Sequence, residues 1–120
     1  MKIAVDLDNT IDATPKEMQS LMSGLMAAGH SVVVLTGTAE KTATKDTWDK
    51  KAQYLDTLGC SNCWNSLVIV ASPDGSGSKA KAEWCDENGV DILIDNSKEN
   101  AREATAAGVP LVLVPWASRS

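Results

Sequence analysis

Two aspartates placed one residue apart, Asp6 and Asp8, are the first residues of this chain whose types and spacing suggest chemistry. They stand near the end of the apolar stretch that opens the sequence. Carboxylates so close together repel each other unless a cation or a proton lies between them. The pair therefore predicts a site for something positively charged.

Polar side chains also follow the second and the fourth apolar runs of the sequence. Thr36 and Gly37 come after the second run, and Asp95 and Asn96 come after the fourth. Three carboxylates with few counter-charges form a hard oxygen site that suits Mg²⁺, which would also neutralise a phosphate dianion. We expect Mg²⁺ as the cofactor, and the expected metal ligands are Asp6, Asp8, Asp95 and Asn96.

A phosphate ester held by this cation would meet a carboxylate nucleophile. Asp6 would attack phosphorus and form an aspartyl-phosphate. Asp8 would protonate the leaving oxygen and then activate the water that hydrolyses the intermediate. Thr36 and Lys81 would bind the non-bridging oxygens in the transition state, with Lys79 as the alternative to Lys81. These residues predict an enzyme, a magnesium-dependent phosphomonoester hydrolase.

The elements that must position these residues form an alternating series of strands and helices. Short runs rich in Val, Ile and Leu predict strands that are covered on both faces, as in a parallel sheet. These runs are residues 3–7, 32–35, 67–71, 90–94 and 111–114. We expect an α/β fold with a doubly wound, five-stranded, Rossmann-like parallel sheet and helices on both faces. Ligands bind such sheets beyond the carboxyl ends of the strands.

Helical patterns lie between the expected strands. Residues 14–17 form a capping box with proline at the first helical position, so a helix should follow to Gly29. A second helix should occupy much of residues 39–58. Ser78 is expected to cap a helix running to Asn88, and Ser97 is expected to cap the last helix.

Composition excludes several functional classes. A chain of 120 residues is expected to form one domain. The net charge of −5 argues against a large electrostatic footprint for nucleic acid. Three cysteines do not make a disulfide framework, and no apolar window is long enough to span a membrane. We therefore expect a cytoplasmic protein that binds no membrane.

Four motifs in this order resemble those of the haloacid dehalogenase superfamily of phosphatases. The first motif is Asp6-Leu7-Asp8-Asn9-Thr10, the second is Thr36, the third is Lys81 and the fourth is Asp95 in ILIDNSKEN. The resemblance implies that residues 1–120 are a single phosphatase core domain of this type. Asn96 stands where many members have a second aspartate, and Glu99 is the other residue that could hold the metal there.

The spacing between the motifs leaves no room for a cap domain. Capless members of the superfamily resemble enzymes that act on exposed phosphoesters, so the resemblance implies a nucleotide or nucleic-acid end as the phosphomonoester substrate. Trp116 follows the last expected strand and could stack on a nucleobase. The residues expected to contact the substrate are Thr10, Thr36, Gly37, Lys81 and Trp116.

Other interpretations stay open at this point. Cys60 and Cys63 have the spacing of a zinc or redox pair, although a zinc site would also need Cys85 and His30. The competing functions are a phosphoacceptor regulatory domain and a phosphate-binding domain without turnover. The order of the motifs disfavours the first, and the presence of Asp8 disfavours the second.

Overall fold

The computed structural model describes residues 1–72 and 74–115 of the chain. In the described residues, five parallel strands form one sheet in the order β3-β2-β1-β4-β5. The strands are β1 (Lys2–Val5), β2 (Ser31–Thr38), β3 (Ser66–Ala71), β4 (Ile92–Ile94) and β5 (Leu111–Leu113). The predicted fold class and the five predicted strands are confirmed.

The strand order reverses at β1. From β1 the chain steps outward to β2 and β3, and it then returns to the other side of β1 for β4 and β5. Val5 of β1 pairs with Val34 of β2 and with Ile94 of β4. The residues that follow these three strands therefore meet at one edge of the sheet, at the point where ligands bind in open α/β sheets.

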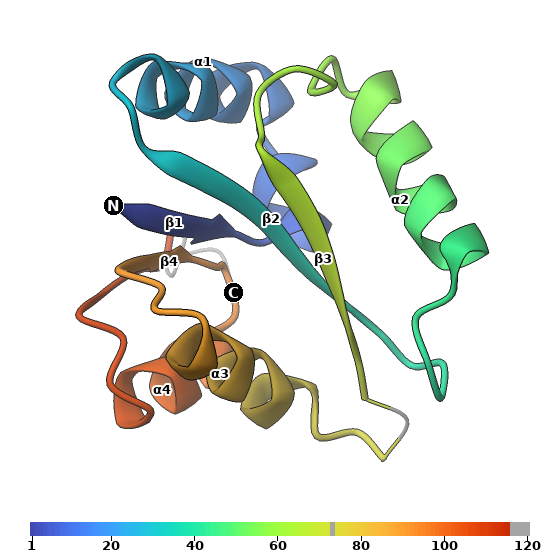
Figure 1. Ribbon diagram of the computed structural model, residues 1–120, viewed down its shortest axis with the longest axis vertical. Helices are drawn as coiled ribbons and strands as arrows, with labels where there is room; N and C mark the ends of the chain where they lie inside the picture. Colours follow the sequence, from blue (N-terminus) through green and yellow to red (C-terminus); the bar gives the residue numbers. More distant parts are fainter. Residues whose placement is uncertain (73, 116–120) are drawn as a thin grey trace.

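Helices cover both faces of the sheet (Figure 1). The helices α1 (Pro15–Ala27) and α2 (Lys45–Thr57) pack on one face, and α3 (Gly77–Glu87) and α4 (Lys98–Ala106) pack on the other. A short irregular turn, η1 (Leu7–Ile11), connects β1 to the segment before α1.

Each face of the sheet has its own core. Side chains alternate along a strand, so Ile3 and Val5 of β1 join the core under α1 and α2, whereas Ala4 joins the core under α3 and α4. Met22 of α1 is fully buried in the first core, and Cys85 of α3 is fully buried in the second. This burial fixes the register of the strands and thereby the position of their carboxyl ends.

The starts of two helices differ from the prediction. Pro15 is the first residue of α1, but Thr14 makes no side-chain capping bond, so the predicted capping box is wrong. A capping box is instead found at α2, where the Thr44 and Thr47 side chains each accept from the other residue's backbone N–H. The helix therefore begins at Lys45, six residues after the earliest predicted position.

The two helices on the other face are nearer to expectation. Ser78 lies inside α3 and not at its cap, because the helix begins at Gly77 after Ser76. Ser97 caps α4 as predicted, and its Oγ accepts from the Asn100 backbone N–H at 3.2 Å. In the part of the chain that the structure describes, no helix is long and apolar enough to cross a membrane.

Candidate functional site

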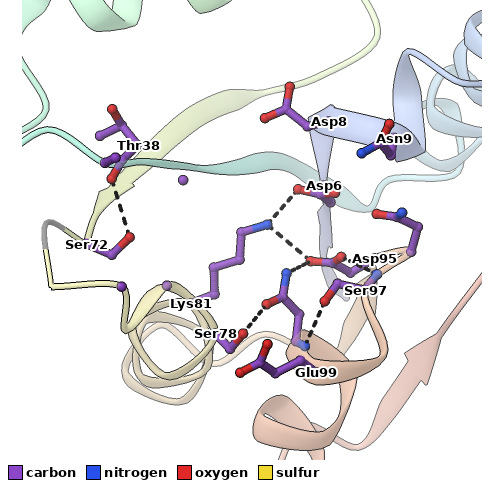
Figure 2. Close-up of a pocket in the computed structure, with 16 residues that line it drawn as sticks. Asp6, Asp8, Asn9, Thr38, Ser72, Ser78, Lys81, Asp95, Ser97 and Glu99 are labelled. Carbon is purple, nitrogen blue, oxygen red and sulfur yellow. Dashed lines mark hydrogen bonds and ion pairs between the residues drawn. The ribbon is translucent and has the colours of Figure 1, made fainter. Parts of the chain in front are cut away.

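A cleft of about 550 Å³ opens at the carboxyl ends of β1, β2 and β4 (Figure 2). Its walls come from the η1 turn, the end of β2, the loop before α3, and the first turns of α3 and α4. Gly37 lines this cleft, as do Asp6, Asp8, Lys81, Asp95 and Asn96, so six of the predicted site residues meet there.

A buried cluster of three charged side chains forms one end of the cleft. The Lys81 ammonium donates to Asp6 Oδ1 at 2.6 Å and to Asp95 Oδ2 at 3.1 Å. Asp6 is 5% exposed, Lys81 is 6% exposed and Asp95 is fully buried. Because β1 and β4 pair in parallel, the aspartates that follow them lie side by side, and the helix α3 carries Lys81 to both. We call Asp6, Lys81 and Asp95 the charged cluster.

Burial and charge shift the pKa values of this cluster. Burial raises the pKa of Asp6 from 3.8 to about 6, against the opposing charge of Lys81 and with an added contribution from Asp95. Burial alone would lower the pKa of Lys81, but the carboxylates of Asp6 and Asp95 outweigh it and raise that pKa. The charged form of Asp6 is therefore disfavoured in this site even with an ammonium in contact.

Hydrogen bonds from α3 and α4 hold Asp95 in place. Its Oδ1 accepts from the Ser97 backbone N–H at 2.9 Å, and its Oδ2 accepts from Asn100 Nδ2 at 2.9 Å. Ser78 Oγ in turn donates to Asn100 Oδ1 at 2.7 Å. Sequence analysis missed Asn100 and Ser78 as site residues. The sequence feature that could have identified Asn100 is the helix cap at Ser97. This cap places Asn100 in the first turn of α4, beside the end of β4.

Thr10 connects Asp6 with Asn96 behind the cleft. Its Oγ1 lies 3.1 Å from Asp6 Oδ2 and 3.2 Å from Asn96 Oδ1, and it accepts from the Asn96 backbone N–H at 3.1 Å. One hydroxyl hydrogen serves only one of these two acceptors at a time. Thr10 is 1% exposed and does not line the cleft, so its place suits orientation of Asp6 and not contact with a ligand.

Asp8 lies at the rim of the cleft and not beside Asp6. Its side chain is 57% exposed, and its Oδ2 is 3.5 Å from Lys51 Nζ. The turn that carries it includes Asn9 at a φ of 62°, a left-handed conformation. Asp12 holds this turn, because its carboxylate accepts from the Asn9 backbone N–H at 2.6 Å and from the Tyr54 hydroxyl at 2.7 Å.

The predicted metal ligands do not form a cage of three carboxylates. Among the described residues, no group of three or more His, Cys, Asp or Glu side chains is placed to hold a metal ion. The cation between Asp6 and Asp95 is the ammonium of Lys81. Glu99, the alternative to Asn96, also lines the cleft.

Other predicted site residues have different places. Thr36 is fully buried, does not line the cleft, and its Oγ1 has no hydrogen-bond partner among the described residues. Thr38, two residues later, lines the cleft instead. Lys79 is exposed and outside the cleft, so Lys81 is the lysine of this site. Trp116 lies outside the described residues.

The cysteines are all free and buried. Burial raises the pKa of Cys63 to about 12 and that of Cys85 to about 11. His30 lies elsewhere, with Nδ1 3.0 Å from the amino group of Met1. The described residues thus place no zinc site at Cys60 and Cys63.

Comparison with known proteins shows the fold. No family model matches the sequence, and no curated protein matches it. Among solved structures, the chain is similar to a universal stress protein from Archaeoglobus fulgidus, with a TM-score of 0.60 and 12% sequence identity. The match covers 94% of this chain and 92% of that chain. At this identity the likeness shows a shared Rossmann-like fold.

This finding overturns the expected membership of the haloacid dehalogenase superfamily. The structural neighbour belongs to a different superfamily, and no family model supports the phosphatase assignment. The predicted magnesium-dependent phosphomonoesterase with its aspartyl-phosphate, and the description as a hydrolase and nucleotidase, are corrected with it. Catalysis of any kind and the use of Mg²⁺ stay predictions.

The physical reason lies in the architecture. Every doubly wound sheet brings the residues after its central strands to one edge, so a few polar residues in the right order arise without shared chemistry. In the site, Asp6 Oδ1 accepts from Lys81 at 2.6 Å, and Asp6 Oδ2 lies 3.1 Å from the Thr10 hydroxyl.

Proposed function

We propose that this chain is a binding domain that holds a phosphorylated small molecule together with Mg²⁺ in the cleft at the carboxyl ends of β1, β2 and β4. Cleavage of the ligand is no part of this function. The charge balance of the cleft is the observation that carries the proposal, and its size and the orientation of two helices support it.

The cleft is acidic. Among the described residues, its charged lining consists of Asp6, Asp8, Asp95 and Glu99 against Lys81. The raised pKa of Asp6 reflects the cost of negative charge in this place. A bare phosphate would be repelled, whereas a phosphate that arrives with a divalent cation would neutralise part of the acidic charge.

The cleft also has features that suit an anionic group. Its volume of about 550 Å³ lies within the range of small-molecule sites. The first turns of α3 and α4 both open on it, with Ser78 and Ser97 among the lining residues. Backbone N–H groups at helix N-termini favour anions. Lys81 adds a positive charge between the two helices.

Mg²⁺ suits this donor set because it binds proteins through one or two carboxylates and keeps waters or phosphate oxygens as its other ligands. Asp8, which is exposed at the rim, and the Asn96 amide oxygen are the residues that would hold the ion. The ion would supply the positive charge that admits phosphate. Lys81 and the first turns of α3 and α4 would bind the phosphate itself.

The cysteines support a cytoplasmic location for this domain. Cys60, Cys63 and Cys85 are free thiols in the structure. Such thiols suit a reducing compartment, where disulfides are rare. We therefore propose that binding takes place in the cytoplasm.

Phosphorus NMR titration of inorganic phosphate tests the proposed function. We expect phosphate to bind in the presence of Mg²⁺ and to bind at least about tenfold more weakly when the ion is removed by chelation. Asp8→Asn should weaken the magnesium-dependent binding, whereas Asp86→Asn, at an exposed position of α3 outside the cleft, should not. Phosphate binding of equal strength with and without Mg²⁺, or no binding in either case, would refute the proposal.

A further inference from the structure

Part of the cleft wall is built from short side chains that carry hydroxyl groups. We call Thr38, Ser72 and Ser78 the hydroxyl wall; Thr38 ends β2, Ser72 follows β3, and Ser78 lies in the first turn of α3. In Figure 2, Thr38 and Ser72 lie on one side of the Lys81 side chain, and Asp6 and Asp95 lie on the other.

The hydroxyl wall keeps unused hydrogen-bonding capacity among the described residues. Thr38 Oγ1 accepts from the Glu40 backbone N–H at 3.3 Å. Ser72 Oγ donates to the Thr38 carbonyl oxygen at 3.4 Å, and Ser78 Oγ donates to Asn100. Each hydroxyl has one hydrogen and two lone pairs. Thr38 therefore retains a donor and an acceptor for a ligand, and Ser72 and Ser78 retain acceptors.

The position of this wall depends on two glycines. A side-chain carbon at Gly77 would lie 3.2 Å from Ser72 Oγ, so any larger residue there would press on that hydroxyl. Gly75, in the preceding turn, has a φ of +81°, which side chains rarely adopt. The glycine at position 77 thus lets Ser72 Oγ lie close to the start of α3, at the cleft.

The described lining contains no side chain that would stack on a nucleobase. No aromatic side chain and no Leu, Ile, Val or Met lines the cleft among the residues that the structure describes. Stacking on an aromatic side chain strengthens binding by about 5- to 150-fold per base. A base would gain no such contact from the lining residues that the structure describes. A ligand with several hydroxyl groups would instead find donors and acceptors on the hydroxyl wall, on Asn100 and on Glu99.

We propose that the phosphorylated ligand is polyhydroxylated, a sugar phosphate or polyol phosphate, with its phosphate beside the charged cluster and its hydroxyl groups against the hydroxyl wall. This inference rests on the proposed function and names the ligand class of the same cleft. A site built to hydrogen-bond hydroxyl groups discriminates strongly against analogues that lack them, because its own polar groups are then left unpaired.

Calorimetric titration in the presence of Mg²⁺ tests this inference with matched phosphate monoesters. The probes are glucose 6-phosphate, which carries several hydroxyl groups, phenyl phosphate, which carries none, and thymidine 5′-monophosphate, which carries a base. We expect glucose 6-phosphate to bind at least about tenfold more tightly than either of the others. Inorganic phosphate serves as the reference ligand.

A variant of the hydroxyl wall gives a second readout. Thr38→Val removes one hydroxyl at nearly constant volume and should weaken binding of glucose 6-phosphate by about 2- to 13-fold. The same variant should leave the affinity for inorganic phosphate unchanged. Thr57→Val, at an exposed position of α2 outside the cleft, is the matched control and should change neither affinity.

The outcomes separate the two proposals. If phenyl phosphate or thymidine 5′-monophosphate binds as tightly as glucose 6-phosphate, the ligand class is wrong although phosphate binding stands. An equal loss of affinity for glucose 6-phosphate and inorganic phosphate in Thr38→Val would also overturn the ligand class. If no probe binds with Mg²⁺, inorganic phosphate included, the proposed function fails and this inference fails with it.

Discussion

Replacing Lys81 with methionine should strongly destabilise the protein. The change removes the ammonium that lies 2.6 Å from Asp6 and 3.1 Å from Asp95 and keeps most of the side-chain stem. Two carboxylates that are 5% and 0% exposed would then lack their cation. Removing one partner from a buried ion pair costs about 3–5 kcal/mol. We expect the free energy of unfolding at pH 7.5 to fall by about this amount.

The loss should be smaller at pH 5. In the folded protein the pKa of Asp6 is raised from 3.8 to about 6, and removal of the Lys81 charge raises it further. A carboxyl whose folded pKa lies above its unfolded pKa binds more protons in the folded state, so stability falls as pH rises through that interval. At pH 5 a proton neutralises Asp6 and replaces part of the missing positive charge. The loss there should be lower by about 1 kcal/mol or more.

Urea unfolding followed by tryptophan fluorescence at both pH values measures this effect. Lys79→Met is the matched control, because Lys79 is exposed on the same helix and its replacement should change stability by less than about 0.5 kcal/mol. Combining Lys81→Met with Asp6→Asn should recover part of the loss, since the amide carries no charge. A loss in Lys81→Met no larger than that in Lys79→Met, or one that is equal at both pH values, would refute the electrostatic account.

Two further pairs of variants test the local structure by the same unfolding assay. Thr36→Val should keep or raise the free energy of unfolding, by up to about 1–3 kcal/mol, because Thr36 Oγ1 is buried and has no partner among the described residues. Thr10→Val should lower it by about 1–3 kcal/mol, because the Thr10 hydroxyl bonds to Asp6 or Asn96. Similar losses in the two valine variants would contradict this assignment. Thr44→Ala should lower the free energy of unfolding by about 1 kcal/mol, because the Thr44 side chain makes a capping bond. Thr14→Ala should lower it by less than about 0.5 kcal/mol, because Thr14 makes no such bond. Equal losses in the two variants would show that the caps are misassigned.

Much of the fold could be predicted because each strand is buried on both faces. Runs such as VVVL at residues 32–35 lack the alternation of a half-exposed strand, and this pattern together with the helices between the runs predicts a parallel sheet. Helix starts were less predictable. Thr14 has the sequence pattern of a cap, but its backbone conformation gives no capping bond, whereas Thr44 and Thr47 cap reciprocally without a Glu or Gln.

The site was predictable to the extent that strand pairing decides it. Asp6 and Asp95 follow paired strands, so their meeting required only the sheet order. To predict the position of Thr36, it was also necessary to know on which face of the sheet its side chain lies. Val32 and Val34 belong to the core under α1 and α2, and alternation sends Thr36 to that same face, whereas Lys81 reaches the cleft from α3 on the other face.

The sequence alone could not predict which cation lies at the charged cluster. Repulsion between carboxylates predicts a positive charge, but an ammonium and a metal ion satisfy that requirement equally well. Lys81 reaches both carboxylates because α3 begins at Gly77 and turns this residue inward while Lys79 faces solvent. That orientation follows from how α3 packs on the sheet, which spacing along the chain does not determine.

The energetics of the charged cluster indicate that its residues serve ligand binding and not folding. A buried ion pair adds little net stability, because the desolvation of its charges offsets their attraction, and apolar residues of similar volume often stabilise as well or better. The strands that lead into Asp6 and Asp95 are almost wholly apolar, and the change to carboxylates comes where the cleft begins. With the pKa of Asp6 raised to about 6, the free protein holds negative charge in an unfavourable place, and a cation that entered the cleft would relieve it. Such a ligand would stabilise the folded state by mass action, by about 2.7 kcal/mol at a concentration of 100 times Kd. Charged residues that add little to the stability of the free fold are typical of a binding site, which is the role we propose for this edge of the sheet.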